Sequence, residues 1–411
     1  MQFKRFVIDI SPLRQSRAFR YAYAARTASV LVTGMMLVAA SIQLYELTKS
    51  SLAVALLNVF MAVPMVIALL IGGVLSDRLD RRKLMMWSRS VYVFSVLLFL
   101  LNTLVAEPSI YVIYVAAMIG GAASGISIPA MMSATPALVG REHLASAAAL
   151  SGLSMQLGGV LGPLLAGVLI AGPGGLVACY VIVLAGVLTT PFLLSRLPAL
   201  PPKGADHSVS ATQAFVEGFR YMLHTPLLRS LLLIDLAAVF FATPLALLPE
   251  WGDVVLGQGA TATGALYAAP AIGATLTALS SGWVRSLQRP GVTIIGAVFI
   301  WGIAIIALSQ STHLYPAMFA LAIMGSADTV SKMLRMTLVQ RHTPDHLLGR
   351  MSALWMTQSS MGTAAGNLQM GAISRWFNPS IALLLGGVAC SVSAAVFATR
   401  NSSLKSVNGH T

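Results

Sequence analysis

Two acidic residues stand inside long apolar stretches of this sequence. Asp235 comes nine residues after Pro226, and Asp328 comes twelve residues after Pro316. In helices that rise about 1.5 Å per residue, both positions lie near the middle of a hydrocarbon layer about 30 Å thick. A carboxylate there costs roughly 2.5–3.5 kcal/mol on insertion scales, and such a residue usually faces a polar cavity. Each acid could therefore take up and release a proton.

The two acids differ in their neighbours along the chain. Lys332 lies four residues after Asp328, and Arg335 follows one turn later. An acid and a base at this spacing pair on a helix surface, so a static ion pair competes with a proton-carrying role for Asp328. Asp235 has no base within four positions. We therefore expect Asp235→Asn to be tolerated or stabilising, and Asp328→Asn to leave Lys332 unpaired.

Arg26 is a third candidate for chemistry, about one turn into the first apolar stretch. Its planar guanidinium can hold carboxylate or phenolate oxygens through parallel hydrogen bonds. The alternative is that the side chain reaches out to the membrane surface and serves only as an anchor.

The composition identifies an integral membrane protein that must position these residues. Of 411 residues, 57% are hydrophobic and 9% are charged, whereas soluble domains carry about 25% charged residues. Unbroken apolar runs predict helices, and not the short alternating strands of a membrane barrel. Twelve helices are predicted, near residues 24–47, 52–75, 84–106, 109–138, 145–171, 174–195, 226–250, 261–283, 291–310, 314–340, 351–374 and 379–399.

The net charge of +13 carries information about topology. If the first helix starts inside the cell, all of the 26 basic residues except Lys49 and Arg375 fall in cytoplasmic segments or at cytoplasmic helix ends. This bias places both chain termini in the cytoplasm. The charge therefore predicts orientation and not binding to nucleic acid. The segment up to Arg20 lacks the apolar core of a signal peptide.

Several kinds of chemistry find no support in the sequence. Cys179 and Cys390 each lie in a predicted membrane helix, which argues against a disulfide framework and against a metal cluster. No phosphate-binding loop of the Walker A type is present. We expect no catalytic residue, no metal and no cofactor. Any movement of a solute must then be driven by an ion gradient or by the gradient of the solute itself.

The chain divides into two halves joined by a polar linker. Residues 196–225 form the longest polar stretch and end in an amphipathic segment near 211–224. The segment REHLASAAAL at 141–150 resembles PDHLLGRMSAL at 344–354, and each precedes the fifth helix of its half. Parallel repeats of six helices describe the major facilitator architecture. We expect an all-α membrane protein of twelve transmembrane helices in two six-helix repeats, 1–195 and 226–411.

In that architecture the first, seventh and tenth helices line a central cavity. Arg26, Asp235 and Asp328 are therefore candidates for binding a solute. The two acids are also candidates for coupling its movement to protons.

The stretch GGVLSDRLDRRK at residues 72–83 resembles the signature loop of the major facilitator superfamily. The matching positions are Gly73, Leu75, Asp77, Arg78, Arg81 and Arg82. In the family this loop latches the two halves together on the cytoplasmic side. Gly73 would let two helices approach closely, and Asp77 would face the positive N-terminal end of a helix. Asp80 stands where the family usually has glycine, and a solvated loop without a latching role is the alternative.

A glycine-rich motif in the fifth helix resembles one that is common in exporters of the superfamily. The sequence is GGVLGPLLAG, with Gly158, Gly162, Pro163 and Gly167. Small residues permit tight helix packing, and proline permits a bend. The motif favours export over uptake. The fourth helix, SIYVIYVAAMIGGAASG, lacks the arginine that drug–proton antiporters of the superfamily usually carry there.

A closer resemblance covers most of the chain. The segments SATPALVGREHL, LYAAPAIGATLTALSSGW and TPDHLLGRMSALWMTQ are similar to those of the enterobactin exporter family, which moves a catecholate siderophore to the periplasm. Arg26 matches an arginine of that family. The resemblance implies a proton-coupled siderophore exporter of the bacterial inner membrane, a monomer whose partners are a small-molecule substrate and lipid. Macrolide efflux proteins supply the first alternative, and a transport-inactive sensor or scaffold the second.

Overall fold

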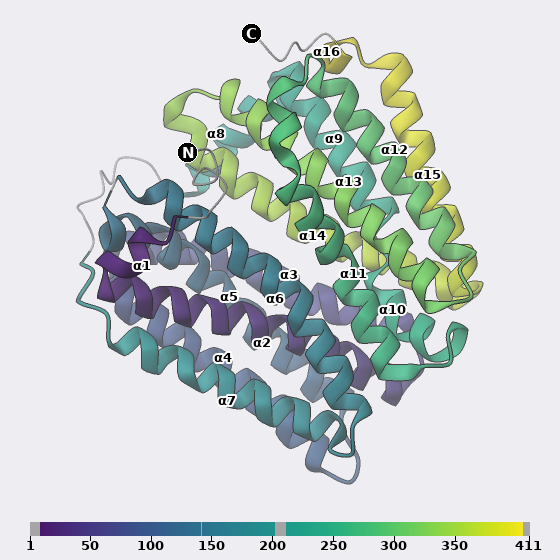
Figure 1. Ribbon diagram of the computed structural model, residues 1–411, viewed down its shortest axis with the longest axis horizontal. Coiled ribbons are helices and arrows are strands. Elements are labelled where there is room, and N and C mark those ends of the chain that lie inside the picture. Colours follow the sequence, from purple (N-terminus) through teal and green to yellow (C-terminus); the bar gives the residue numbers. More distant parts are fainter. Residues whose placement is uncertain (1–8, 141, 202–210, 406–411) are drawn as a thin grey trace, which may run out of the picture. The chain divides into compact units, whose positions relative to one another are not determined.

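A computed structural model describes residues 9–140, 142–201 and 211–405 (Figure 1). Within these ranges the chain forms helices and no strands. The helices are α1 (Ser11–Gln15), α2 (Arg17–Thr48), α3 (Ser51–Arg78), α4 (Arg81–Leu104), α5 (Ile110–Val139), α6 (Leu144–Ala171), α7 (Gly175–Ser195), α8 (Ala211–His224), α9 (Pro226–Phe241), η2 (Leu245–Leu247), α10 (Leu248–Glu250), η3 (Trp251–Val255), α11 (Gly259–Leu279), η4 (Ser281–Ser286), α12 (Pro290–Ser309), α13 (Leu314–Arg341), η5 (Asp345–Leu347), α14 (Leu348–Trp376), α15 (Pro379–Arg400) and α16 (Ser402–Lys405).

The membrane-spanning helices match the twelve apolar stretches of the sequence. Among the described residues, eleven helices are long and apolar enough to cross a membrane. The twelfth stretch is α14, which has 29 residues but a more polar composition, with Gln358 and Asn367 among its side chains. The predicted all-α membrane class is confirmed. The amphipathic segment of the linker also forms a helix, α8.

The seventh predicted helix is broken, whereas the sequence predicts a continuous helix over 226–250. α9 ends at Phe241, and Pro244, which cannot donate a backbone hydrogen bond, precedes three short helical turns. The freed backbone groups find partners on other helices. Trp301 Nε1 donates to the carbonyl of Ala242 at 2.8 Å, and the amide of Ala246 donates to Asn367 Oδ1 at 2.9 Å. Such partners make a break tolerable in hydrocarbon.

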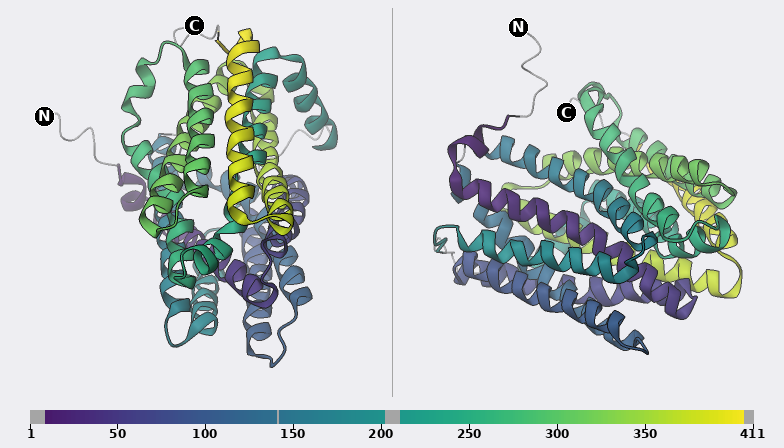
Figure 2. Two further views of the ribbon diagram at one scale, coloured as in Figure 1. Left: turned by 90° about the vertical axis from the view of Figure 1, so that its right-hand side faces the viewer. Right: turned by 60° about the horizontal axis from the view of Figure 1, so that its bottom comes forward.

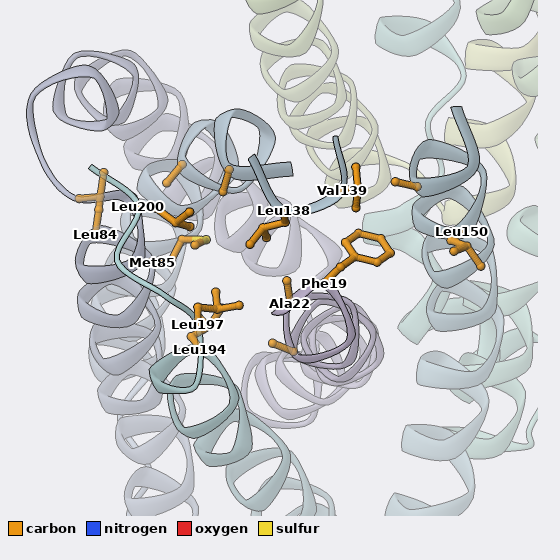
Figure 3. Packing of buried hydrophobic residues seen from close by; sticks show 14 residues of the cluster. Phe19, Ala22, Leu84, Met85, Leu138, Val139, Leu150, Leu194, Leu197 and Leu200 are labelled. Atoms are coloured by element: carbon orange, nitrogen blue, oxygen red, sulfur yellow. The ribbon is translucent and has the colours of Figure 1, made fainter. Parts of the chain in front are cut away.

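The chain folds into two compact units. Unit 1 contains the described parts of Met1–Gln43 and Phe60–His207. Its helix α4 packs against α5 and α7, and α6 also packs against α7. A cluster of buried apolar residues lies where these helices begin or end, and Figure 3 shows Phe19, Ala22 and Leu138 within it.

Unit 2 contains the described parts of Leu44–Val59 and Ser208–Thr411. In this unit α13 packs against α11 and α12, and α12 also packs against α15 (Figure 2). α9 packs against α14 and α15. The connection between α2 and α3 also belongs to this unit. Lys49 pairs with Asp253 at 3.1 Å, and the Ser51 hydroxyl donates to Glu250. The connection between α2 and α3 is therefore bound to the short helical turns that follow α9.

Glycines let α2 and α6 approach closely within unit 1. A Cβ added to Gly158 would lie 2.6 Å from a side-chain carbon of Val30, and one added to Gly162 would lie 2.7 Å from the carbonyl oxygen of Leu31. Gly34 on α2 faces the same contact. The tight packing expected of this glycine motif is therefore present at Gly158 and Gly162, while Gly167 is buried further along α6.

Replacing Gly158 by leucine should disrupt the contact between α2 and α6, since the added carbons would overlap Val30. Overpacking of this kind costs about 1–3 kcal/mol. We expect a lower melting temperature for the purified Gly158→Leu protein in detergent. The matched control is Gly152→Leu on the same helix, because a Cβ at Gly152 meets no atom within 4 Å. Equal melting temperatures for the two variants would contradict the packing role of Gly158.

Candidate functional site

A small pocket, open to solvent, lies within unit 1. Its lining is mainly apolar and aromatic, with Arg26 as the charged member: Phe19, Ala22, Tyr23, Arg26, Met85, Met131, Ala134, Thr135, Leu138 and Ser151. Arg26 is half-buried, and its Nη2 lies 3.5 Å from the sulfur of Met155. The structure thus places this predicted arginine in the lining of the pocket.

Helical spacing explains how these residues meet. Phe19, Tyr23 and Arg26 follow one another at intervals of four and three on α2, so they share one face of that helix. α5 contributes Met131 and Leu138, and α4 contributes Met85. Figure 3 shows Phe19, Met85 and Leu138 around the same space. The result is a pocket that offers aromatic rings, flexible methionines and one guanidinium.

The signature loop is held firmly inside unit 1. Asp80 caps α4, accepting hydrogen bonds from the amides of Arg82 at 2.8 Å and Lys83 at 3.4 Å, and it also accepts from the amide of Leu200 at 3.3 Å. The residue that departs from the family pattern therefore has a structural use, because a carboxylate satisfies the free amides of a helix N-terminus.

Two arginines of the loop bind carbonyl oxygens at other helices. Arg81 Nη1 donates to the carbonyl of Ser133 at 3.2 Å, and Arg82 Nη2 donates to that of Ser195 at 2.7 Å. Ser195 is the last residue of α7, where carbonyls lack helical partners and cations are favoured. Arg81 and Arg82 thus tie α4 to α5 and α7. Asp77 and Arg78 are exposed.

The close contact between helices that was predicted at Gly73 is made by the preceding residue, Gly72, against α5. A Cβ at Gly73 would meet no atom within 4 Å, whereas one at Gly72 would lie 2.8 Å from the Cα of Ile126. Gly72 is buried against α5, and Gly73 points to open space. The prediction for Gly73 was therefore wrong by one position.

Asp235 is not the unpaired acid that its helix suggests. It forms an ion pair with Arg335 of α13, and both side chains are 4% exposed. Arg335 also stacks over the ring of Trp355, with its guanidinium carbon 5.6 Å from the ring centre. Loss of one partner would leave a buried charge without compensation. The structure therefore overturns the premise that Asp235 is unpaired, and with it the reason to expect that Asp235→Asn is tolerated.

Asp328 pairs with Lys332, as the spacing along α13 predicts. The Nζ–Oδ2 distance is 2.6 Å, and the lysine side chain is 53% exposed. A half-exposed lysine can extend its amine to water when it loses the acid. This pair is therefore less sensitive to substitution than the buried pair of Asp235.

Polar groups without partners surround the buried ion pair in unit 2. Within the described residues, the Ser331 hydroxyl, the Trp355 ring nitrogen and both polar atoms of Gln358 are buried and make no hydrogen bond. Arg335 and Trp355 were missed at the sequence level. One feature of the sequence points to Arg335: it lies seven residues after Asp328, so the two residues share one face of α13.

A bundle of this kind, with the signature loop and ionisable residues within its helices, defines a transporter of the major facilitator superfamily. The family model described as "Transmembrane secretion effector" matches residues 8–410, so the chain belongs to that family. It is a multi-pass membrane protein that handles a small-molecule substrate.

Two of the similar curated proteins are enterobactin exporters. The chain is 32% identical over 381 residues to the enterobactin exporter EntS of Shigella boydii serotype 18 (strain CDC 3083-94 / BS512), covering 92% of this chain and 90% of the relative. It is 31% identical over 389 residues to the enterobactin exporter EntS of Citrobacter koseri, covering 94% and 92%.

Solved transporters share the fold at low sequence identity. The nucleoside transporter NupG superposes with a TM-score of 0.75 at 11% identity, covering 93% of this chain and 98% of that structure. A D-xylose–proton symporter gives a TM-score of 0.67 at 15% identity, covering 92% and 96%. At these identities the likeness concerns the fold alone.

Asp235 and Arg335 should behave as a coupled pair in a double-mutant cycle. We expect Asp235→Asn and Arg335→Gln each to destabilise the purified protein by about 3–5 kcal/mol, because each leaves the other charge buried alone. The double variant should be more stable than either single variant. Thermal or denaturant unfolding in detergent measures the cycle.

Asp328→Asn is the matched control, and it should lower stability by much less than Asp235→Asn, because Lys332 is half-exposed. Additive effects of the Asp235 and Arg335 substitutions would show that the two side chains do not act as a pair.

Proposed function

We propose that this protein exports an acidic, aromatic siderophore of the enterobactin kind from the cytoplasm to the periplasm. The observation that carries the proposal is the similarity to enterobactin exporters over more than nine-tenths of the chain. The site residues add chemical support, because the cavity of unit 1 combines a guanidinium with aromatic and methionine side chains.

The cavity suits a catecholate ligand. Phe19 and Tyr23 can contact aromatic rings, and Met85 and Met131 can adapt to their shape. Arg26 can donate two hydrogen bonds to the adjacent oxygens of a catechol. The ligand then gains apolar contact and a charge-assisted contact in the same pocket.

Alternating access is the proposed mechanism. The halves 1–195 and 226–411, joined by the linker 196–225, would rock around the substrate. The protein would work as a monomer in the inner membrane, with both chain ends in the cytoplasm. In this proposal the exposed Asp77 and Arg78 are the latching residues, and the anchored Arg81 and Arg82 hold the loop in place.

Proton coupling would act through the buried pair in unit 2. Protonation of Asp235 removes its charge and releases Arg335, which changes the favoured packing of α9 and α13. An antiporter requires that the paired and released arrangements favour opposite openings. Asp328, whose partner is half-exposed, is the second candidate for the coupling acid.

Efflux of macrolides or other amphiphilic drugs is the alternative cargo. The apolar lining of the cavity favours it, since all but a few of the lining side chains are hydrocarbon or aromatic. Arg26 argues the other way, because a cation at the cavity disfavours the positively charged amine that many such drugs carry.

Deletion of the gene should make iron-starved cells retain their siderophore. We expect more siderophore and precursor in the cell and less in the medium, measured by chromatography of both fractions. Expression of the intact chain should restore secretion, and the same chain carrying Gly158→Leu should restore it poorly.

Unchanged secretion together with greater sensitivity to macrolides would identify the drug-efflux function instead. Unchanged secretion and unchanged drug sensitivity would contradict both proposals.

Siderophore uptake into inside-out vesicles should rise when the lumen is made acidic. The Asp235→Asn/Arg335→Gln protein, which carries no unpaired buried charge, should transport at a rate that no longer depends on the pH gradient. Asp328→Asn should keep that dependence. If the double variant still responds to the gradient and Asp328→Asn does not, the coupling acid is Asp328.

A further inference from the structure

A second arginine lies near the cavity of unit 1. Arg89 is on α4, one helical turn after the cavity residue Met85, and it is half-buried. Arg26 lies nine residues into α2 and Arg89 lies eight residues into α4. At about 1.5 Å per residue, both lie roughly 12–14 Å from the start of their helices. Arg26 and Arg89 thus lie at a similar distance from the starts of their helices.

The two helices are neighbours, because Gln43 Nε2 on α2 donates a hydrogen bond to Thr103 Oγ1 on α4 at 3.1 Å. Arg89 lies fourteen residues before Thr103, and Ser29 lies fourteen residues before Gln43, so Arg89 is level with a position within one turn of Arg26. The bond between Gln43 and Thr103 restrains α2 and α4 relative to each other. Arg26 and Arg89 are therefore held near each other by the fold despite their like charges.

Neither arginine has an acidic partner within the described part of the chain. The contrast is with the buried Arg335, which pairs with Asp235, and with Arg350, which pairs with Glu217. Two uncompensated cations on neighbouring helices repel each other in a partly desolvated setting. A bound anion with two or more acidic oxygens would relieve that repulsion and neutralise both groups.

We propose that Arg89 is a second substrate-binding residue, which acts with Arg26 to select solutes that carry at least two acidic oxygens. This inference rests on the proposed export function and narrows its substrate class to polyanions. A catecholate siderophore presents several such oxygens on separate rings, so each guanidinium can bind a different ring. A neutral or cationic drug gains nothing from the pair.

Ligand binding to the purified protein tests the role of Arg89. We expect Arg89→Gln and Arg26→Gln each to weaken enterobactin binding by tenfold or more, measured by calorimetry or by quenching of tryptophan fluorescence. Arg89→Lys should bind with intermediate affinity, because lysine keeps the charge but cannot form paired hydrogen bonds. Erythromycin binding should not weaken in Arg89→Gln.

Arg20→Gln is the matched control, an arginine of α2 in the same unit that is exposed. It should bind enterobactin as the unaltered protein does. Wild-type affinity for enterobactin in Arg89→Gln would overturn the proposal.

A second measurement separates this inference from the choice of siderophore as cargo. Melting temperatures are compared in sodium sulfate and in sodium chloride at equal ionic strength. Sulfate, a dianion, should stabilise the unaltered protein and Arg20→Gln by the same amount, and should stabilise Arg26→Gln and Arg89→Gln less. An equal gain in all four proteins would overturn the anion site, even if enterobactin is exported. If sulfate raises the melting temperature of the two variants less, but the unaltered protein does not bind enterobactin, the anion site stands and the siderophore is rejected as its ligand.

Discussion

Hydrocarbon offers no hydrogen bonds, so each polar group that enters the membrane must find its partner within the protein. The fold meets this requirement with side chains from distant parts of the sequence. The break after α9 is possible because Trp301 and Asn367 bind backbone groups of Ala242 and Ala246 that the break leaves free. The buried charge of Asp235 is possible because α13 brings Arg335 to it.

Sites where the requirement is not met within the protein are the informative ones. Ser331, Trp355 and Gln358 have buried polar atoms with no partner in the described residues. Ser331 lies on α13 with Arg335, and Trp355 and Gln358 lie on α14, where the ring of Trp355 contacts Arg335. Arg26 and Arg89 likewise lack acidic partners there. Water or a solute must satisfy such groups. Both units therefore contain polar groups whose partners must come from outside the described residues.

Local patterns in the sequence predicted the helices and the depth of the charged residues, because both depend on hydropathy and on the fixed rise of a helix. The ion pair of Asp328 with Lys332 was also predictable, since the two are four residues apart. The pair of Asp235 with Arg335 was not, because it joins residues that are one hundred positions apart. Asp80 shows the same limit, since its bond to Leu200 depends on how α7 ends beside α4.

The connection between α2 and α3 has a consequence for biosynthesis. Ser51 and Glu250, which it joins by a hydrogen bond, are 199 residues apart in the chain. At a synthesis rate of about 5–20 residues per second, Glu250 is added on the order of 10–40 s after Ser51. Lys49, which adopts a positive φ of 47° at this turn, is therefore translated long before Asp253 can neutralise it. The order of translation therefore prevents this contact from forming until more than half of the chain has been made.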